Sequence, residues 1–314
     1  MSNEQSVTME TVSYPHGRHQ VVGNLFLPSV FDKAKRYPAV IVTHPFGGVK
    51  EQAAGVYARK LAEQGFIALA YDASHYGDSG GEPRLYEVPG DRVEDIRCGV
   101  DYLSIRPQID ENRIGALGIC AGGGYTVNAS QTEYRIKAVA TVSAFDVGSA
   151  RREGVPRGLI TYEQRVQRLK EIGAQRTREA RGEPLRMINF VPASADEITP
   201  ATPQLYREGY DYYCTARAQH PNAPGKYVFT SLGLQMAFFP FDQVETISPR
   251  PLLMIVGSNA DTKYFSEEAL AKAKAPKELF VIPGATHIDL YDRPQFVTPA
   301  VAKLTDFFRT ALKA

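Results

Sequence analysis

Residues 113–129 of this 314-residue chain read RIGALGICAGGGYTVNA, and this stretch decides the expected fold. Its first seven residues form an apolar run typical of a buried strand, and the small residues after Cys120 favour the start of a helix. Cys120 therefore lies at a sharp strand-to-helix turn, inside the pattern G-x-C-x-G. Gly118 and Gly122 are expected there because strand and helix touch beside such a turn and leave no room for side chains.

Further strand-then-helix units surround this stretch on both sides. Amphipathic helices are expected near residues 51–64, 93–103 and 301–312. Apolar runs predict buried strands at residues 37–43, 66–71, 136–142, 251–256 and 279–282. Alternation of this kind predicts the α/β class, with a doubly wound, mostly parallel sheet and helices on both of its faces.

Residues 146–250 interrupt this alternation. An insertion near the carboxyl ends of the strands would lie over the crevice where α/β sheets bind ligands. We therefore expect a core of residues 1–145 and 251–314, with a helical cap or lid formed by residues 146–250. The basic run 151–186 is typical of a solvated helix face, or it attracts an anionic group such as the phosphates of a coenzyme A thioester. The aromatic second half either forms the cap's own core or lines an acyl pocket.

A second segment, residues 77–81 (GDSGG), also fits the nucleophile-elbow pattern, with Ser79 as its centre. Polar residues precede Ser79 and a proline-containing segment follows it, so neither a strand nor a helix is indicated there. We expect Ser79 in a glycine-rich turn and Cys120 at the elbow. A thiol at a helix N-terminus has a lowered pKa. The alternative for Cys120 is a buried structural cysteine; a phosphate-binding turn is disfavoured because the P-loop lysine is absent.

With this elbow in its strand context, the chain resembles the α/β-hydrolase superfamily, and within it the dienelactone-hydrolase-related branch. That branch uses G-x-C-x-G where most esterases use G-x-S-x-G, and the resemblance covers nearly the whole chain outside the cap. It implies an acid and a histidine on loops after the last two strands, where Asp261 and His287 stand. His287 would take the thiol proton or activate water, and Asp261 would orient the imidazole.

Other interpretations of these residues stay open. Asp261 could instead form a turn, and His287 could be a loop histidine bonded to the backbone. Asp289 and Asp292 lie nearby in the sequence and are alternative acid partners.

The resemblance also implies an oxyanion hole of two backbone donors. One is the N–H of Ala121, and the other comes from the loop after residues 37–43, where Phe46 is preferred because Pro45 has no N–H. His44 is expected to brace that loop. Glu51 is a candidate contact of the resting thiol, or else it caps the following helix.

These residues predict an enzyme that cleaves an ester, lactone or thioester through an acyl-enzyme on Cys120. Dienelactone hydrolases lack a hundred-residue cap, so a different substrate is expected. One alternative is an acyltransferase that uses the same triad with an amine or alcohol acceptor. Another is a non-catalytic ligand-binding protein on the same scaffold.

Net charge, the N-terminal segment and the cysteine content indicate which partners and which cell compartment to expect. The net charge of +1 indicates neither nucleic acid nor membrane as a partner, which leaves a small-molecule ester or thioester. The N-terminal segment lacks the pattern of a secretory signal, and three widely spaced cysteines favour the cytoplasm. No cofactor is expected, and no Cys/His spacing indicates a metal. The oligomeric state, a homo-oligomer included, is left open by the sequence.

Overall fold

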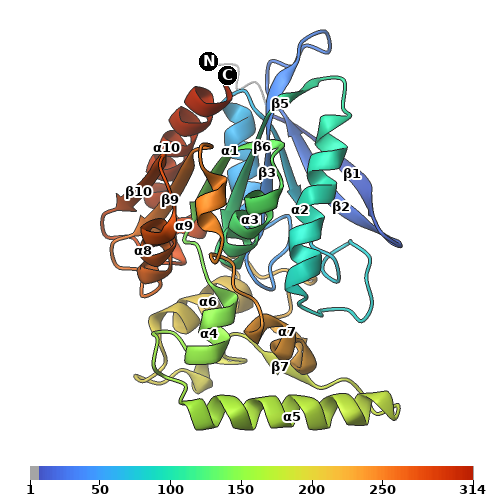
Figure 1. The fold of residues 1–314 in the computed structure, drawn as a ribbon, viewed down its shortest axis with the longest axis vertical. Helices are drawn as coiled ribbons and strands as arrows, with labels where there is room; N and C mark the ends of the chain where they lie inside the picture. The colour runs from blue at the N-terminus through green and yellow to red at the C-terminus, as the bar shows by residue number, and fades with distance from the viewer. Residues whose placement is uncertain (1–6, 314) are drawn as a thin grey trace.

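The computed structural model describes residues 7–313, so the first six residues of the N-terminal segment considered above lie outside it. An eight-stranded sheet with the order β1-β2-β4-β3-β5-β6-β9-β10 forms its centre (Figure 1). The strands β3, β4, β5, β6, β9 and β10 run parallel, whereas β2 pairs antiparallel with both β1 and β4. The predicted α/β class with a mostly parallel sheet is confirmed. The strand bounds are β1 (Thr8–His16), β2 (His19–Leu27), β3 (Tyr37–Thr43), β4 (Ile67–Tyr71), β5 (Ile109–Ile119), β6 (Ile136–Val142), β9 (Leu252–Gly257) and β10 (Lys277–Ile282).

Helices cover both faces of this sheet. On one face α1 packs beside α10, and on the other α2 packs beside α3, with α8 against β9 and β10. Central strands between two helical layers must be apolar on both sides, which explains why β4 (IALAY) is buried at every position. The helix bounds are α1 (Ala53–Glu63), α2 (Pro89–Ser104), α3 (Ala121–Thr132), α8 (Lys263–Lys272), α9 (Asp289–Asp292) and α10 (Pro294–Leu312).

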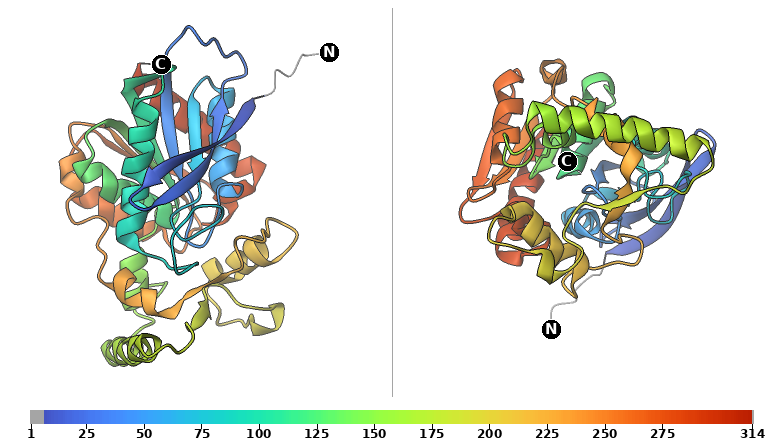
Figure 2. Two further views of the ribbon diagram at one scale, coloured as in Figure 1. Left: turned by 90° about the vertical axis from the view of Figure 1, so that its right-hand side faces the viewer. Right: turned by 90° about the horizontal axis from the view of Figure 1, so that it is seen from below.

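The inserted residues 146–250, called the cap below, form most of a second layer under the carboxyl ends of the strands (Figures 1 and 2). The sequence predicted a helical cap, but the layer is not wholly helical, because β7 and β8 pair antiparallel within it. The 3₁₀ turn η3 ends the insertion and packs against α3 and α8 of the core. The cap elements are α4 (Val147–Glu153), α5 (Tyr162–Ala180), β7 (Met187–Asn189), η1 (Ala195–Glu197), α6 (Gln204–Cys214), β8 (Lys226–Val228), η2 (Phe229–Ser231), α7 (Leu232–Met236) and η3 (Val244–Ile247).

The long helix α5 carries the charged half of the cap. It begins at a capping box in which Thr161 and Gln164 bond each other's backbone N–H groups. Only Ile172 and Gln175 are buried along its length, so residues 162–180 of the basic run 151–186 form a mostly solvated helix, whereas Arg151 lies in α4 and packs on Phe46. Within residues 7–313, every helix is too short or too polar to cross a bilayer.

Candidate active site

The strand-to-helix turn at Cys120 has the geometry that the glycines predict. Cys120 adopts φ 55° and ψ −125°, a strained conformation for a residue other than glycine. A Cβ atom on Gly118 would lie 2.2 Å from the carbonyl oxygen of Gly122, and one on Gly122 would lie 2.4 Å from that of Thr43. Side chains are therefore excluded on both sides of the turn, and the strand-to-helix turn predicted at Cys120 is present between β5 and α3.

The sulfur of Cys120 is almost enclosed, with the residue 7% exposed. Burial raises the pKa of the thiol, while hydrogen bonds from the Tyr291 hydroxyl and from the N–H groups of Ala121 and Phe46 lower it; the net pKa lies above its ordinary value. The expectation of a lowered pKa at the helix N-terminus is therefore wrong for the resting site, because desolvation outweighs the helix terminus. Both N–H groups that the resemblance implied as oxyanion donors are close enough to the sulfur to lower the pKa of the thiol.

His287 is buried and hydrogen-bonded through both ring nitrogens. Its Nδ1 lies 2.5 Å from the Thr262 hydroxyl, and its Nε2 lies 3.2 Å from the Tyr291 hydroxyl. Burial lowers the pKa of His287 to about 3, which keeps the imidazole neutral at pH 7. The Tyr291 hydroxyl thus bonds His287, and it is close enough to Cys120 to lower the pKa of the thiol, so it lies between the thiol and the imidazole.

The expected acid partner of His287 needs correction. The Asp261 carboxylate does not bond the imidazole; it accepts the N–H of Leu205, 3.0 Å away, in the first turn of α6. The next residue of the same loop, Thr262, contacts the histidine instead. The alternatives are also otherwise engaged, since Asp289 accepts the Thr286 N–H and Asp292 pairs with an arginine, Arg217.

Tyr291 is the residue that the sequence interpretation missed. It is 1% exposed, and burial raises the pKa of its hydroxyl well above its ordinary value, which keeps the phenol protonated. It stands four residues after His287, the spacing of one helical turn, which brings two side chains to the same side of a helix. That spacing was the available signal, although the helix itself, α9, starts only at Asp289.

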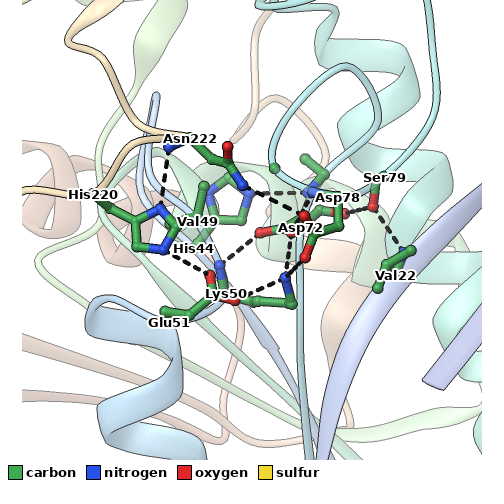
Figure 3. A network of polar contacts seen from close by, with 12 residues as sticks. Val22, His44, Val49, Lys50, Glu51, Asp72, Asp78, Ser79, His220 and Asn222 are labelled. Atoms are coloured by element: carbon green, nitrogen blue, oxygen red, sulfur yellow. Dashed lines mark hydrogen bonds and ion pairs between the residues drawn. The ribbon is translucent and has the colours of Figure 1, made fainter. Parts of the chain in front are cut away.

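The loop that carries Phe46 is held by a polar network (Figure 3). The Lys50 ammonium lies 2.8 Å from Asp72, 2.6 Å from Asp78 and 2.8 Å from Glu51, and the Lys50 N–H also donates to Asp72. Burial lowers the pKa of Lys50, but the Asp72 charge and the hydrogen bonds to Asp72, Asp78 and Glu51 together raise it more, so the ammonium stays charged. The same network fixes the loop and therefore the Phe46 N–H.

Two roles expected from the sequence change within this network. Glu51 pairs with Lys50 and lies 4.0 Å from His220 of the cap, so it is not the contact of the thiol that the resemblance suggested. It does not cap α1 either, since the N-cap residue is Gln52. The Gln52 side chain instead donates to the carbonyl of Ala218, which ties the loop to the cap.

His44 and Ser79 have the structural roles expected of them. The His44 Nε2 accepts the N–H of Ala73 at 3.0 Å, and its carbonyl accepts a bond from the buried Arg92. Ser79 donates to the carbonyl of Asp72 and accepts the N–H of Val22, which locks it in a buried turn. Neither residue faces the thiol.

Comparison with known proteins matches this geometry to a family. The model of the family described as "Dienelactone hydrolase family" matches residues 28–151. The Escherichia coli (strain K12) protein YcjY, itself uncharacterized, is 39% identical over 289 residues, which cover 92% of this chain and 93% of YcjY. The chain belongs to the dienelactone hydrolase family. This family member is accordingly an α/β-hydrolase enzyme.

A solved structure and more distant named enzymes agree with this assignment. The crystal structure of the hypothetical protein PA2218 from Pseudomonas aeruginosa has a TM-score of 0.91 and 34% identity, covering 99% of this chain and 98% of that chain. The acyltransferase drtE of Aspergillus calidoustus is 23% identical over 320 residues, 96% of this chain and 97% of drtE. A thiohydrolase of Eupenicillium brefeldianum is 25% identical over 267 residues, 83% of this chain and 82% of that enzyme.

One group of described residues has donor atoms close enough to hold a metal ion. His16 and His19, on either side of the β1–β2 turn, and Asp95 of α2 have these atoms within 4.8 Å of one another. The Ser74 hydroxyl lies among them, 3.0 Å from His16, 2.7 Å from His19 and 2.5 Å from Asp95. These hydrogen bonds satisfy the group without an ion, and it shares no residue with the site around Cys120.

Proposed function

We propose that this enzyme hydrolyses a small-molecule ester, lactone or thioester through an acyl-enzyme on Cys120. The observation that carries the proposal is the position of the Tyr291 hydroxyl, which lies 3.2 Å from the Nε2 of His287 and close enough to the Cys120 thiol to lower its pKa. Two backbone N–H groups, those of Ala121 and Phe46, reach the same sulfur. A nucleophile, a route for its proton and donors for an oxyanion are therefore adjacent.

The first step is attack by the thiol with removal of its proton. If the Nδ1 proton of neutral His287 points to Thr262, Nε2 is free to accept a proton. The thiol proton passes to the Tyr291 oxygen as the phenolic proton passes to Nε2, while the sulfur bonds to the substrate carbonyl carbon. The negative charge that forms on the carbonyl oxygen is stabilised by the N–H groups of Ala121 and Phe46.

Collapse of this intermediate reverses the proton route. The bond from the carbonyl carbon to the leaving oxygen or sulfur breaks, and the leaving group takes the proton from His287 through Tyr291. Water then attacks the acyl-thioester, gives a proton by the same route, and releases the acid and the free thiol. Because a thiolate leaves readily from such intermediates, lactones and thioesters suit Cys120 better than amides.

The proposal is tested by trapping the acyl-enzyme. A panel of p-nitrophenyl esters and acyl-thioesters is turned over by the wild type, and intact-protein mass spectrometry followed by peptide mapping finds the acyl group on Cys120. The Cys120→Ala variant loses both turnover and adduct. The matched Cys98→Ala variant, in α2, retains both. An active Cys120→Ala variant would show that another residue is the nucleophile.

Acyl transfer is the second candidate, and one observation favours it. Cys120 is 7% exposed beneath the cap, an enclosure that restricts the access of water to the acyl-enzyme. The similarity to the acyltransferase drtE supports the same interpretation. Adding a primary alcohol or amine to the assay measures how the acyl group partitions between water and the acceptor.

The proposal also includes a reducing compartment such as the cytoplasm. Cys98, Cys120 and Cys214 are all unpaired thiols. A thiol nucleophile works only in its reduced form, and unpaired cysteines are typical of cytoplasmic proteins.

A further inference from the structure

Two cavities under the carboxyl ends of the strands share lining residues. One, of about 740 Å³, lies inside the cap between α4, α5 and α7, a volume typical of ligand pockets. The other, of about 50 Å³, is lined by Phe46, Tyr213 and Tyr291 beside the thiol. Arg151 and Tyr206 line both cavities, so they stand at the junction between them.

Arg151 brings an unpaired charge to this junction. Its Nε donates to the Gln235 side chain at 2.9 Å, and its guanidinium carbon lies 4.9 Å from the centre of the Phe46 ring and 5.3 Å from that of Tyr227. Within residues 7–313, its two Nη groups make no hydrogen bond and no carboxylate pairs with it. Those donors are not sealed in the protein, so they open onto the cavity.

Two tyrosines, Tyr206 and Tyr227, lie near the Arg151 guanidinium. The hydroxyls of Tyr206 and Tyr227 lie close enough to act on the charge of Arg151, and neither bonds another described side chain or backbone group. Glu87 also acts on Arg151 through space, but this carboxylate already accepts a bond from Tyr125 and lies 3.7 Å from the Arg92 guanidinium. Glu163 and Glu171 of α5 line the larger cavity, but neither pairs with Arg151, so within residues 7–313 the two Nη groups of Arg151 have no acceptor.

We propose that Arg151, Tyr206 and Tyr227 form a subsite that binds an anionic group of the substrate. The inference rests on the proposed function, because it assigns a substrate class to the same thiol site. A half-buried guanidinium without a partner is costly, and an incoming carboxylate or phosphate supplies the bidentate acceptor that it lacks.

The distance from the thiol defines where the anion lies in the substrate. Arg151 stacks on Phe46, whose N–H reaches the Cys120 sulfur, so a single side chain separates the guanidinium from the reacting carbonyl. The anion accordingly lies a few bonds from that carbonyl, and the apolar remainder enters the cap cavity. Half-esters and half-thioesters of dicarboxylic acids have this form. A phosphate on the leaving group would supply the same chemistry from the other side of the scissile bond.

The test compares matched substrates and matched variants. The p-nitrophenyl monoester of adipic acid and the neutral p-nitrophenyl hexanoate share one chain length, so their kcat/KM ratio reports on the carboxylate alone. Arg151→Met is expected to lower kcat/KM for the adipate monoester by about 10- to 100-fold and to leave the hexanoate within threefold. Tyr206→Phe, which removes a single hydroxyl, lowers the same ratio by about three- to tenfold. The control Arg186→Met removes a cap arginine that stacks on Phe229 outside both cavities, and it leaves the ratio unchanged.

Binding is measured separately from turnover. Adipate raises the Tm of the wild type and not that of Arg151→Met, whereas the neutral hexanamide affects the Tm of the two proteins equally. Equal effects of Arg151→Met on both esters, or no difference between the proteins in adipate binding, overturn the subsite even if Cys120 is acylated. Adipate binding that depends on Arg151, in a protein that never acylates Cys120, supports the subsite and overturns the proposed function. Acyl-coenzyme A compared with acyl-N-acetylcysteamine separates the leaving-group source: a preference for coenzyme A that Arg151→Met abolishes assigns the anion to the leaving group.

Discussion

Replacing Tyr291 with phenylalanine removes one oxygen atom from the centre of the site. That hydroxyl is 3.2 Å from the Nε2 of His287 and lowers the pKa of the Cys120 thiol, so its removal affects both groups together. Positioned acid–base groups contribute about 10²- to 10⁴-fold to rate, which is about 2.7 to 5.5 kcal/mol of barrier. We therefore expect kcat/KM of Tyr291→Phe to fall by about 10²-fold or more. The cost in unfolding free energy is about 1–3 kcal/mol, because buried partners are left unsatisfied.

Steady-state hydrolysis of p-nitrophenyl acetate and of an acyl-thioester measures the rate, and iodoacetamide alkylation across pH measures the thiol. The Tyr291 hydroxyl lowers the pKa of Cys120, so its removal moves the alkylation profile to higher pH. A merely structural tyrosine would leave that profile in place. Tyr57→Phe is the matched control, since its buried hydroxyl donates to the carbonyl of Leu290 and touches neither reacting group.

The reasoning is refuted by a particular pair of results. If Tyr291→Phe keeps kcat/KM within threefold of the wild type while His287→Ala abolishes turnover, the imidazole takes the thiol proton without the phenol. A loss of rate with an unchanged alkylation profile would assign Tyr291 to packing alone.

Three further predictions concern pH, the loop network and the elbow. Burial lowers the pKa of His287 from 6.5 to about 3, so the imidazole takes up a proton at a higher pH in the unfolded chain than in the folded one. The unfolding free energy therefore has its largest value above pH 6.5 and falls by up to about 1.4 kcal/mol per pH unit as the pH drops towards 3. Urea titrations of His287→Gln should lack this pH dependence. Asp72→Asn removes the only fully buried carboxylate among the described partners of the Lys50 ammonium (Figure 3). Denaturant titration should find that the unfolding free energy falls by about 3 kcal/mol. This is the low end for a broken buried pair, because the more exposed carboxylates of Asp78 and Glu51 remain. Gly122→Ala puts a Cβ 2.4 Å from a backbone carbonyl oxygen, so it should lower the unfolding free energy by about 1–3 kcal/mol and remove most of the activity. Gly173→Ala, in open space on α5, should raise the unfolding free energy by about 0.5–1 kcal/mol. Equal Tm changes in the two alanine variants would contradict the steric argument.

The turn at Cys120 could be predicted from the sequence because it depends on residues that are close together in the chain. Gly118, Cys120 and Gly122 are close in the chain, and their roles follow from the contact of one strand with the next helix. The same holds for Ser79, whose polar and proline-containing neighbours exclude a strand or a helix. Phe46 was found because Pro45 has no N–H to donate.

The side chain that bonds the Nδ1 of His287 could not be predicted from neighbouring residues in the sequence. Asp261 and Thr262 are consecutive residues in a loop, and successive side chains of an extended or turning backbone point in different directions. Only the course of that loop decides which of the two meets His287, and it selects Thr262, while the first turn of α6 takes the Asp261 carboxylate. The sign of the Cys120 pKa shift depends in the same way on how completely the cap covers the sulfur.

The sequence by itself determined the α/β class, the order of the strands along the chain and the cysteine at the elbow, since each depends on residues adjacent in the chain. The tertiary structure decided the partners of that cysteine. Tyr291 reaches Cys120 across 171 positions of the sequence, and Arg151 of the cap meets Phe46 of the core only when the two layers are stacked. Contacts of this kind depend on the packing of elements that are distant in the chain, and hydrophobic periodicity carries no information about which side chains then face one another.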